Sequence, residues 1–424
     1  MTHLRRCRVL RAALLVLAFL APPTLAGIVT LYCRLQGTDL LDPAAIRVPA
    51  PAPRLPATAK RLAVIVAGNR GTEITDTLPL LELLEESEAF EVRVVAPERT
   101  LSPFKSSAIA GSGLDFYPDL SFADYAEFAG DRTPDLIVIP YLTAWRTADA
   151  AVVPWIRAHA GPATTVLSIC AGAEVAAATG LFDGHEATAH APLLAPLADR
   201  HPEIRYRGDV RWVRDGRRIS SGTLTAGLDA TLAAIDALAG RAAALRAAAA
   251  TGYRHVRFLD DPSSPTTGSR LGIALETAFR WERTRVAVVV EDGVSETSLA
   301  AALDVPAATM TTDGIAVAAT LAPIRTRNGF RVMPRDDDRN LGRYDAVVRP
   351  AALAGYDRAV EQLASTHGGP MARVAARLMN YPVEDLELGG GPPVGVTMAL
   401  RALLLGAAGV VLARLLMRSC PDRA

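Results

Sequence analysis

The sequence contains an internal repeat, in which four motifs recur in the same order along the 424-residue chain. Each copy begins with an apolar hexapeptide and ends with a longer stretch that aligns without a gap. Motifs that recur in order are typical of a duplicated structural unit. The matched pairs are RLAVIV (61–66) with RVAVVV (285–290), APERT (96–100) with APIRT (322–326), DLIVIP (135–140) with DAVVRP (345–350), and 226–253 with 354–381.

Short apolar segments alternate with helical segments in the first copy. Residues 61–66, 91–97 and 135–140 are apolar runs of strand length, and leucines recur three and four residues apart in 72–87. This alternation predicts an α/β fold with a doubly wound, flavodoxin-like parallel sheet that carries helices on both faces. RWVRDGRRIS (211–220) predicts a hairpin with its turn at the Asp-Gly pair.

The second copy is incomplete, because it lacks the material that corresponds to residues 141–225 of the first copy. If Glu73 is aligned with Glu296, the position that corresponds to Asp76 is Leu299. We therefore expect a structural role for the second copy, which packs on the first in place of a homodimer mate. The alternative is a degenerate appendage without an ordered interface.

One cysteine lies at a strand-to-helix corner within ATTVLSICAGAEVAAATG. Residues 164–169 read as a buried strand and 173–178 as a helix, so Cys170 lies between them. Backbone N–H groups and the helix dipole at such a corner favour a thiolate and an adjacent oxyanion. The alternative is a small buried core residue. The corner position, with the small pair Ala171 and Gly172 leaving room for a ligand, favours a site.

The remaining composition excludes several classes of protein. The other cysteines lie within or beside terminal apolar segments, so a disulfide framework is not expected. No Cys/His spacing predicts zinc, and we expect neither a metal nor a cofactor. The 45 basic and 45 acidic residues give a net charge of +0, which argues against a nucleic-acid partner. These other cysteines are Cys7, Cys33 and Cys420.

Both ends of the chain carry apolar segments of membrane-spanning length. The first, within residues 1–33, follows four arginines and contains Pro22 and Pro23, and it is either an anchor or a signal peptide cut after Ala26. The second, 394–417, reads as a membrane helix or as an amphipathic helix packed on the protein.

Arginines at the outer ends of both apolar segments predict the orientation of the protein in the cytoplasmic membrane. The positive-inside rule places both termini in the cytoplasm and the folded part outside. Arg401 lies inside the second segment, where it must snorkel, pair or lie at an interface. The expected divisions of the chain are an anchor or signal peptide (1–33), a proline-rich linker (42–60), the first copy (61–263), a linker (264–284), the second copy (285–390) and a membrane helix (394–417).

Three stretches of the first copy resemble the ThiJ/PfpI superfamily, which has a class I glutamine amidotransferase-like fold. They are GTEITDTLPLLELL (71–84), SICAGAEVAAATGLFDGHEATAHAPLLAPLADRHPEIRY (168–206) and RWVRDGRRISSGTLTAGLDATLAAIDAL (211–238). The resemblance is nearest to the subgroup with isonitrile hydratases and the N-terminal halves of AraC-type regulators. It implies that Cys170 is the family's elbow cysteine.

The resemblance also implies two partners for this cysteine. Asp76 matches the acidic residue of the first helix that approaches the sulfur, with Glu73 as a neighbouring alternative; otherwise Asp76 is an ordinary exposed first-turn residue. His190 matches a histidine found near the cysteine, where it would serve as a base, and its alternative role is to cap the helix that follows. His185 and His201 have weaker claims to such a role.

One departure from the family pattern bears on the chemistry. A glycine pair commonly follows the third strand and helps to form the oxyanion hole, but Tyr141 and Leu142 stand there in this chain. This difference predicts a narrower pocket and makes hydrolytic acyl chemistry less expected. The AraC-type relatives have a helix-turn-helix segment after this domain, and this chain does not.

The sequence therefore supports three hypotheses of function. In the first, a membrane-anchored protein uses Cys170 for hydration, hydrolysis or glyoxalase-like addition to a small molecule. Asp76 or His190 would move protons, and the N–H of Ala171 would hold developing charge. In the second, the same site is a ligand- or redox-sensing module. In the third, the fold is a scaffold without activity. The expected partners are a small molecule and the membrane, with packing between the repeats or in a homodimer.

Overall fold

A seven-stranded sheet forms the centre of the first unit, which we define as residues 60–264. In this computed structural model, which describes residues 2–35, 60–107, 111–130, 132–264, 271–350 and 355–419, the strand order is β11–β12–β8–β7–β1–β3–β6. All neighbouring pairs are parallel except the β11–β12 hairpin, so the predicted α/β fold and the predicted hairpin are confirmed. The strands are β1 (Arg61–Val66), β3 (Phe90–Ala96), β6 (Leu120–Ser121), β7 (Leu136–Ile139), β8 (Thr165–Ser168), β11 (Trp212–Asp215) and β12 (Arg218–Ser221).

Helices cover both faces of this sheet, because successive side chains of a strand point to opposite sides. Ala63 and Ile65 of β1 pack into one core, whereas Leu62, Val64 and Val66 pack into the other. The first core is covered by α2 (Leu78–Glu86), α7 (Ala226–Ala239) and α8 (Arg241–Thr251), and the second by α3 (Phe122–Ala129), α4 (Val152–His159), α5 (Ala173–Thr179) and α6 (Leu194–Arg200).

The second unit, residues 284–388, repeats part of this arrangement. Its sheet has the order β17–β14–β13–β18, which matches the order β6–β3–β1–β7 of the first unit. Tyr253 donates to Asp229 at 2.7 Å, and the aligned Tyr381 donates to Asp357 at 2.7 Å. The elements are β13 (Thr284–Val289), α10 (Glu296–Ala307), β14 (Thr312–Ala318), β17 (Asp336–Asp337), β18 (Ala346–Val348), α11 (Gly355–His367) and α12 (Gly369–Leu378).

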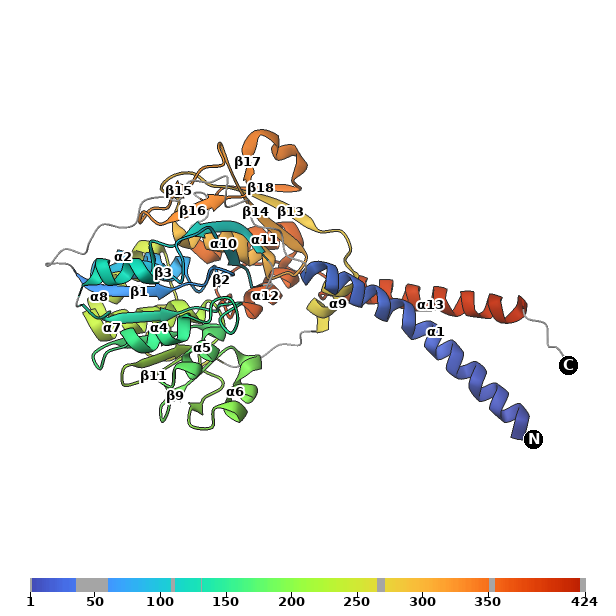
Figure 1. Cartoon of the computed structure of the whole chain (residues 1–424). Coiled ribbons are helices and arrows are strands. Elements are labelled where there is room, and N and C mark those ends of the chain that lie inside the picture. The colour runs from blue at the N-terminus through green and yellow to red at the C-terminus, as the bar shows by residue number, and fades with distance from the viewer. Residues whose placement is uncertain are drawn as a thin grey trace.

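A mixed sheet joins the two units. Strand β16 of the second unit pairs antiparallel with β5 of the first, and α10 packs against α2. Figure 1 shows the second unit lying against the first. Arg335 forms a bidentate ion pair with the buried Asp115, in which Nε and Nη2 donate to the two carboxyl oxygens at 3.0 and 2.6 Å. The units therefore share an ordered interface, and the alternative of a loose appendage is wrong. The sheet contains β15 (Ile324–Arg325), β16 (Arg331–Pro334), β5 (Gly111–Tyr117), β4 (Ser102–Lys105) and β2 (Thr72–Glu73).

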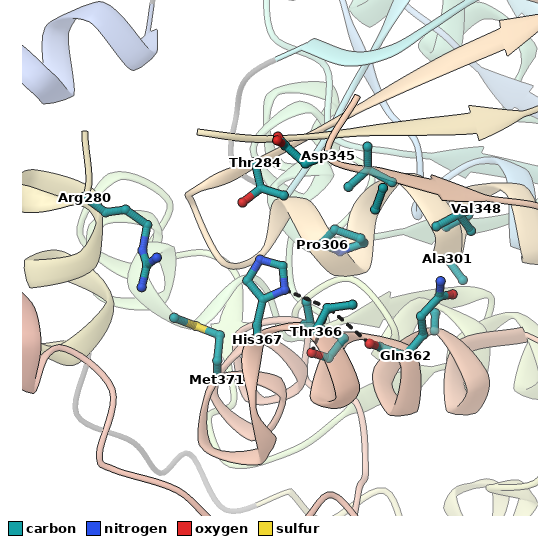
Figure 2. Close-up of a pocket in the computed structure, with 15 residues that line it drawn as sticks. Arg280, Thr284, Ala301, Pro306, Asp345, Val348, Gln362, Thr366, His367 and Met371 are labelled. Atoms are coloured by element: carbon teal, nitrogen blue, oxygen red, sulfur yellow. Dashed lines mark hydrogen bonds between the residues drawn. The ribbon is translucent and has the colours of Figure 1, made fainter. Parts of the chain in front are cut away.

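A cavity of about 410 Å³ lies between α11 and the short sheet of the second unit. Alanine and aliphatic side chains from β18, α10 and α11 form most of its wall, with Arg280 and Gln362 towards opposite ends (Figure 2). In the first unit α7 packs on β8 and β12, which have no counterpart in the shortened second copy. We attribute the cavity to these missing strands.

Filling this cavity is expected to stabilise the protein. Ala359 lines it, so an Ala359→Leu side chain enters empty apolar space and raises the free energy of unfolding by about 1 kcal/mol. Ala234→Leu is the matched control, because Ala234 is fully buried on α7; overpacking there lowers stability by about 2 kcal/mol. Thermal unfolding of the full chain measures both variants, and equal destabilisation would show that the cavity cannot accept a leucine.

Two apolar helices extend together from the units, with both ends of the chain on the same side (Figure 1). They are α1 (Thr2–Leu35) and α13 (Val396–Ser419), whose segments Arg11–Thr30 and Val396–Met417 are long and apolar enough to cross a membrane. Helix α1 continues through its two prolines. A Cβ atom on Gly409 would lie 2.1 Å from the carbonyl oxygen of Ala18, so this glycine permits close helix contact.

The predicted linker 264–284 contains a helix and needs correction. Helix α9 (Leu271–Phe279) packs against α1 and α13, because its apolar side chains find partners there. Arg401 donates to the carbonyl of Phe279 at 3.2 Å and lies 3.4 Å from Glu282, which gives this arginine the partners that the sequence required. The predicted linker 42–60 lies outside the described residues except for its last position.

Candidate functional site

Cys170 lies at the corner that the sequence predicted, between β8 and α5. A three-residue turn, Cys170–Gly172, joins them, and Cys170 has a φ of 54°, which is unfavourable for a residue with a side chain. The N–H of Ile169 donates to Ile139 at 3.0 Å, and that of Gly172 donates back to Ile169 at 2.7 Å. These bonds hold the strained turn, and they leave the N–H of Gly172 occupied.

Gly172 serves close packing rather than ligand space, contrary to our expectation. A Cβ atom at this position would lie 2.2 Å from the carbonyl oxygen of Ile139 and 2.7 Å from that of Pro140. The φ of Gly172 is −57°, an ordinary helical value. The absence of a side chain at Gly172 therefore allows the elbow to sit directly on the end of β7.

The surroundings of the Cys170 sulfur favour the thiol over the thiolate. The residue is only 6% exposed, and burial raises the pKa of its thiol well above the ordinary value. The carboxyl groups of Asp76 and Glu73 raise this pKa further, whereas the N–H groups of Leu224 and Ala171 lower it. The corner alone thus does not produce the thiolate that the sequence suggested.

Asp76 and Glu73 are buried carboxyl groups that precede the first helix instead of lying on it. Glu73 ends β2, and Asp76 lies in the turn before α2, which begins at Leu78. The Asp76 carboxyl accepts the N–H of Tyr141 at 3.0 Å, and the Asp76 N–H donates to Glu73 at 2.5 Å. Asp76 is fully buried, so the alternative of an exposed first-turn residue is wrong.

Burial changes the protonation of both carboxyl groups. It raises the pKa of Asp76 to about 8, and it raises that of Glu73 well above its usual range, with a further contribution from the charge of Asp304. Within the described residues, Oε1 of Glu73 and Oδ1 of Asp76 are buried without a hydrogen-bond partner. The cysteine therefore lies near one carboxyl group, Asp76, that exchanges its proton close to neutral pH, and near a second, Glu73, whose pKa is also raised.

Residues 60–237 match the DJ-1/PfpI family. The chain contains a DJ-1/PfpI family domain. Solved structures with similar folds include DJ-1beta from Drosophila melanogaster, with 19% identity, coverage of 46% of this chain and 99% of that chain, and a TM-score of 0.38. A ThiJ/PfpI family protein from Pseudomonas syringae is 22% identical, the match covers 54% of this chain and 84% of that chain, and the TM-score is 0.39. An AraC family transcriptional regulator from Pseudomonas putida is 17% identical, the match covers 45% of this chain and 98% of that chain, and the TM-score is 0.36. No curated protein matches this chain.

Tyr141 and Leu142 of the DJ-1/PfpI domain fix the acidic loop. The Tyr141 N–H is bonded to Asp76, and its carbonyl accepts the N–H of Glu73 at 3.0 Å. Leu142 forms an isolated antiparallel bridge with Thr72. The N–H of Tyr141 is therefore directed at a carboxyl group, where the family's glycine pair was expected to help bind an oxyanion.

His190 lies beside the elbow of the DJ-1/PfpI domain. The backbone N–H of His190 donates to the Cys170 carbonyl at 3.3 Å, and Nδ1 of its imidazole lies 2.9 Å from Oγ1 of Thr223. The imidazole makes no capping bond to the turn that follows, so the capping alternative is wrong. His185 and His201 pair with surface acids at 3.3 and 3.1 Å. A role for His190 as a base stays a prediction.

Two groups near the cysteine were not identified from the sequence. Leu224 has a φ of 43°, and its N–H faces the sulfur. Asp304 of α10 brings a third carboxyl group to the Glu73 side of the DJ-1/PfpI domain. The available signal was an acidic residue, Asp304, that follows the apolar run Leu299–Leu303 and precedes Val305 in this helix. Across the described ranges, no group of three His, Cys, Asp or Glu residues could hold a metal ion.

Proposed function

We propose that this is a membrane-anchored DJ-1/PfpI protein whose Cys170 performs thiol-dependent chemistry on a small molecule. The observation that carries the proposal is the strained Cys170 beside Asp76, a carboxyl with a pKa of about 8. A group with such a pKa can accept and return a proton near neutral pH. The reaction classes that fit are hydration, hydrolysis and glyoxalase-like addition.

The proposed chemical step begins with the neutral thiol. The sulfur forms a bond to an electrophilic carbon of the substrate while the S–H bond breaks, and the proton moves to the ionised form of Asp76. The electron pair displaced from the substrate carbon resides on its heteroatom, where the N–H groups of Ala171 and Leu224 stabilise the negative charge. Asp76 then returns the proton. His190 is the alternative proton carrier.

A ligand- or redox-sensing role is the second candidate. The low exposure of Cys170 and the raised pKa of its thiol favour the sensing of a ligand, because both slow nucleophilic attack and also slow the thiolate oxidation that a redox sensor requires. The second unit directly precedes the C-terminal helix α13 in the chain. A specific ligand would raise the thermal stability of the full chain through mass action, which a thermal-shift screen detects.

Turnover by the purified full chain tests the enzymatic proposal. We expect consumption of a member of a methylglyoxal and isonitrile panel, and we expect Cys170→Ser to reduce this activity at least about 100-fold. Ser168→Ala, also in the buried strand-to-helix segment, is the matched control and should retain most of it. Wild-type protein that binds a panel member without Cys170-dependent turnover would favour the sensor.

The proposed orientation places both termini in the cytoplasm and the two units outside it. The clusters of arginine at the outer ends of both apolar segments support this arrangement. A reporter that is active only outside the cytoplasm, fused after Ala424, is expected to be silent. An active reporter at this position would reverse the proposed topology.

A further inference from the structure

We infer that the second unit supplies part of the Cys170 site, with Asp304 and the C-terminal end of α12 as its positioning groups. This inference rests on the proposed function, because it names the groups that control the same cysteine. Its test uses the chemical reactivity of the thiol, which can be measured whether or not a substrate is known.

Asp304 reaches into the first unit beside the acidic loop. Its carboxyl oxygens accept Oγ1–H of Thr75 at 2.6 Å and the N–H of Ser107 at 2.6 Å. Tyr356 of α11 lies 2.9 Å from the same Thr75 hydroxyl. The side chains of Asp304, Thr75 and Tyr356 are all buried. The second unit therefore contacts the turn that holds Glu73 and Asp76 from two of its helices.

The quasi-symmetric contact on the other side of the interface has a different charge balance. Glu82 of α2 accepts the backbone N–H of Thr297 at 2.6 Å at the start of α10, whereas Asp304 of α10 accepts the hydroxyl of Thr75 in the turn before α2. Glu82 is also paired with Arg327 at 2.9 Å. Asp304 instead faces Glu73, Asp76 and Tyr356, which are all acidic or neutral. Glu82 is therefore paired with an arginine, whereas the contacts described for Asp304 bring it near other carboxyl groups and include no cation.

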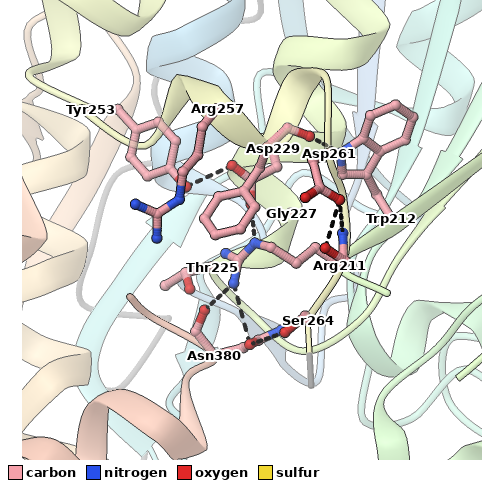
Figure 3. A network of polar contacts seen from close by, with 12 residues as sticks. Arg211, Trp212, Thr225, Gly227, Asp229, Tyr253, Arg257, Asp261, Ser264 and Asn380 are labelled. Carbon is pink, nitrogen blue, oxygen red and sulfur yellow. Dashed lines mark hydrogen bonds and ion pairs between the residues drawn. The ribbon is translucent and has the colours of Figure 1, made fainter. Parts of the chain in front are cut away.

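The end of α12 fixes the loop that carries the Leu224 N–H. Both the N–H and the hydroxyl of Thr225 donate to the carbonyl of Met379, at 3.1 and 2.8 Å. The guanidinium of Arg211, in the first unit, donates to the backbone carbonyl of the next residue, Asn380, at 2.7 Å and to its side-chain oxygen at 3.2 Å (Figure 3). Leu224 is therefore held in its strained conformation by a residue of the second unit.

These contacts predict which carboxyl group holds the proton. The Asp304 carboxyl accepts two short hydrogen bonds, from Thr75 and Ser107. Among Asp304, Glu73 and Asp76, it is therefore the group best suited to carry the negative charge. That charge keeps the proton on Glu73. When Asp304 is replaced by asparagine, Glu73 loses its proton more readily, and a new negative charge beside Cys170 disfavours the thiolate.

The test is the pH profile of Cys170 alkylation in the full chain. Iodoacetamide modification is followed from pH 6 to 10 by mass spectrometry of the Cys170 peptide, which separates it from the other cysteines. Asp304→Asn is expected to slow modification about tenfold at pH 7.5 and across the rising part of the profile, the effect of a thiol pKa that is higher by about one unit. Glu82→Gln disrupts the quasi-symmetric contact and is expected to leave the profile unchanged.

A second variant guards against misfolding of Asp304→Asn. Thr75→Val keeps the shape of the side chain but removes one donor to Asp304, and it should slow modification at pH 7.5 about threefold. Profiles of folded Asp304→Asn and Thr75→Val that superimpose on the wild type would overturn the inference. Equal shifts in Glu82→Gln would do the same. A shifted profile without any Cys170-dependent turnover would support the inference and contradict the proposed enzyme.

Discussion

An Asp76→Asn variant is expected to lose at least about 100-fold of any Cys170-dependent turnover while becoming more stable than the wild type at pH 8. Asparagine can still accept the N–H of Tyr141, so the loop keeps its bond, but the side chain cannot take a proton from the thiol. A loss of activity combined with a gain of stability separates a functional acid from a structural one.

The sign of the stability change follows from the raised pKa of Asp76. The unfolded chain releases this proton near pH 4, whereas the native carboxyl keeps it until about pH 8. The native state therefore binds more protons across this interval, and the free energy of unfolding falls as the pH rises from 4 to 8. Asp76→Asn removes this fall, so the gain in its free energy of unfolding over the wild type is nearly absent at pH 4 and on the order of 5 kcal/mol at pH 8.

Unfolding of the full chain at pH 4, 6 and 8 measures this effect, with Asp119→Asn as the control. Asp119 also accepts a backbone N–H, from Val94 at 2.9 Å, and burial raises its pKa, but it lies beyond the end of β3. Its variant should alter the pH dependence of stability in the same direction and leave turnover intact. Asp76→Asn with wild-type turnover would reduce Asp76 to a buried structural acid.

The local elements of the first unit were predictable because they depend on short-range patterns. The apolar run at 61–66 forms β1 with the predicted bounds, and the corner at Cys170 lies where a β-branched run meets alanines. The resemblance placed Asp76 near the sulfur. Its position before the helix was missed, because helix boundaries depend on tertiary contacts such as the Tyr141 bond.

The groups from the second unit were not predictable in this way. Asp304 and Thr75 are 229 residues apart, and a single sequence does not reveal that α10 packs on α2. The positive φ of Leu224 was equally hidden, because the adjacent Thr225 is bonded to Met379, a residue 154 positions away in the second unit. Both cases concern contacts across the interface between the units. The repeat predicted that an interface exists, but it did not predict which side chains meet there.

Gly172→Ala is expected to destabilise the protein by more than about 3 kcal/mol, although alanine suits the helical backbone of this position. The added methyl would lie 2.2 Å from the carbonyl oxygen of Ile139, and main-chain atoms cannot move away as a flexible side chain would. The elbow must therefore shift away from β7, and a displacement of about 1 Å would reduce turnover on the order of 100-fold.

Gly161→Ala is the matched control for this substitution. The closest neighbour of its added Cβ would be the Thr133 side chain at 3.5 Å, an ordinary contact, so we expect a change within about 0.5 kcal/mol. Thermal unfolding and Cys170 alkylation of both variants provide the comparison. If Gly172→Ala unfolds at the same temperature as Gly161→Ala and keeps the wild-type alkylation profile, the elbow has room to relax. In that case the strained conformation of Cys170 is not imposed by contact with β7.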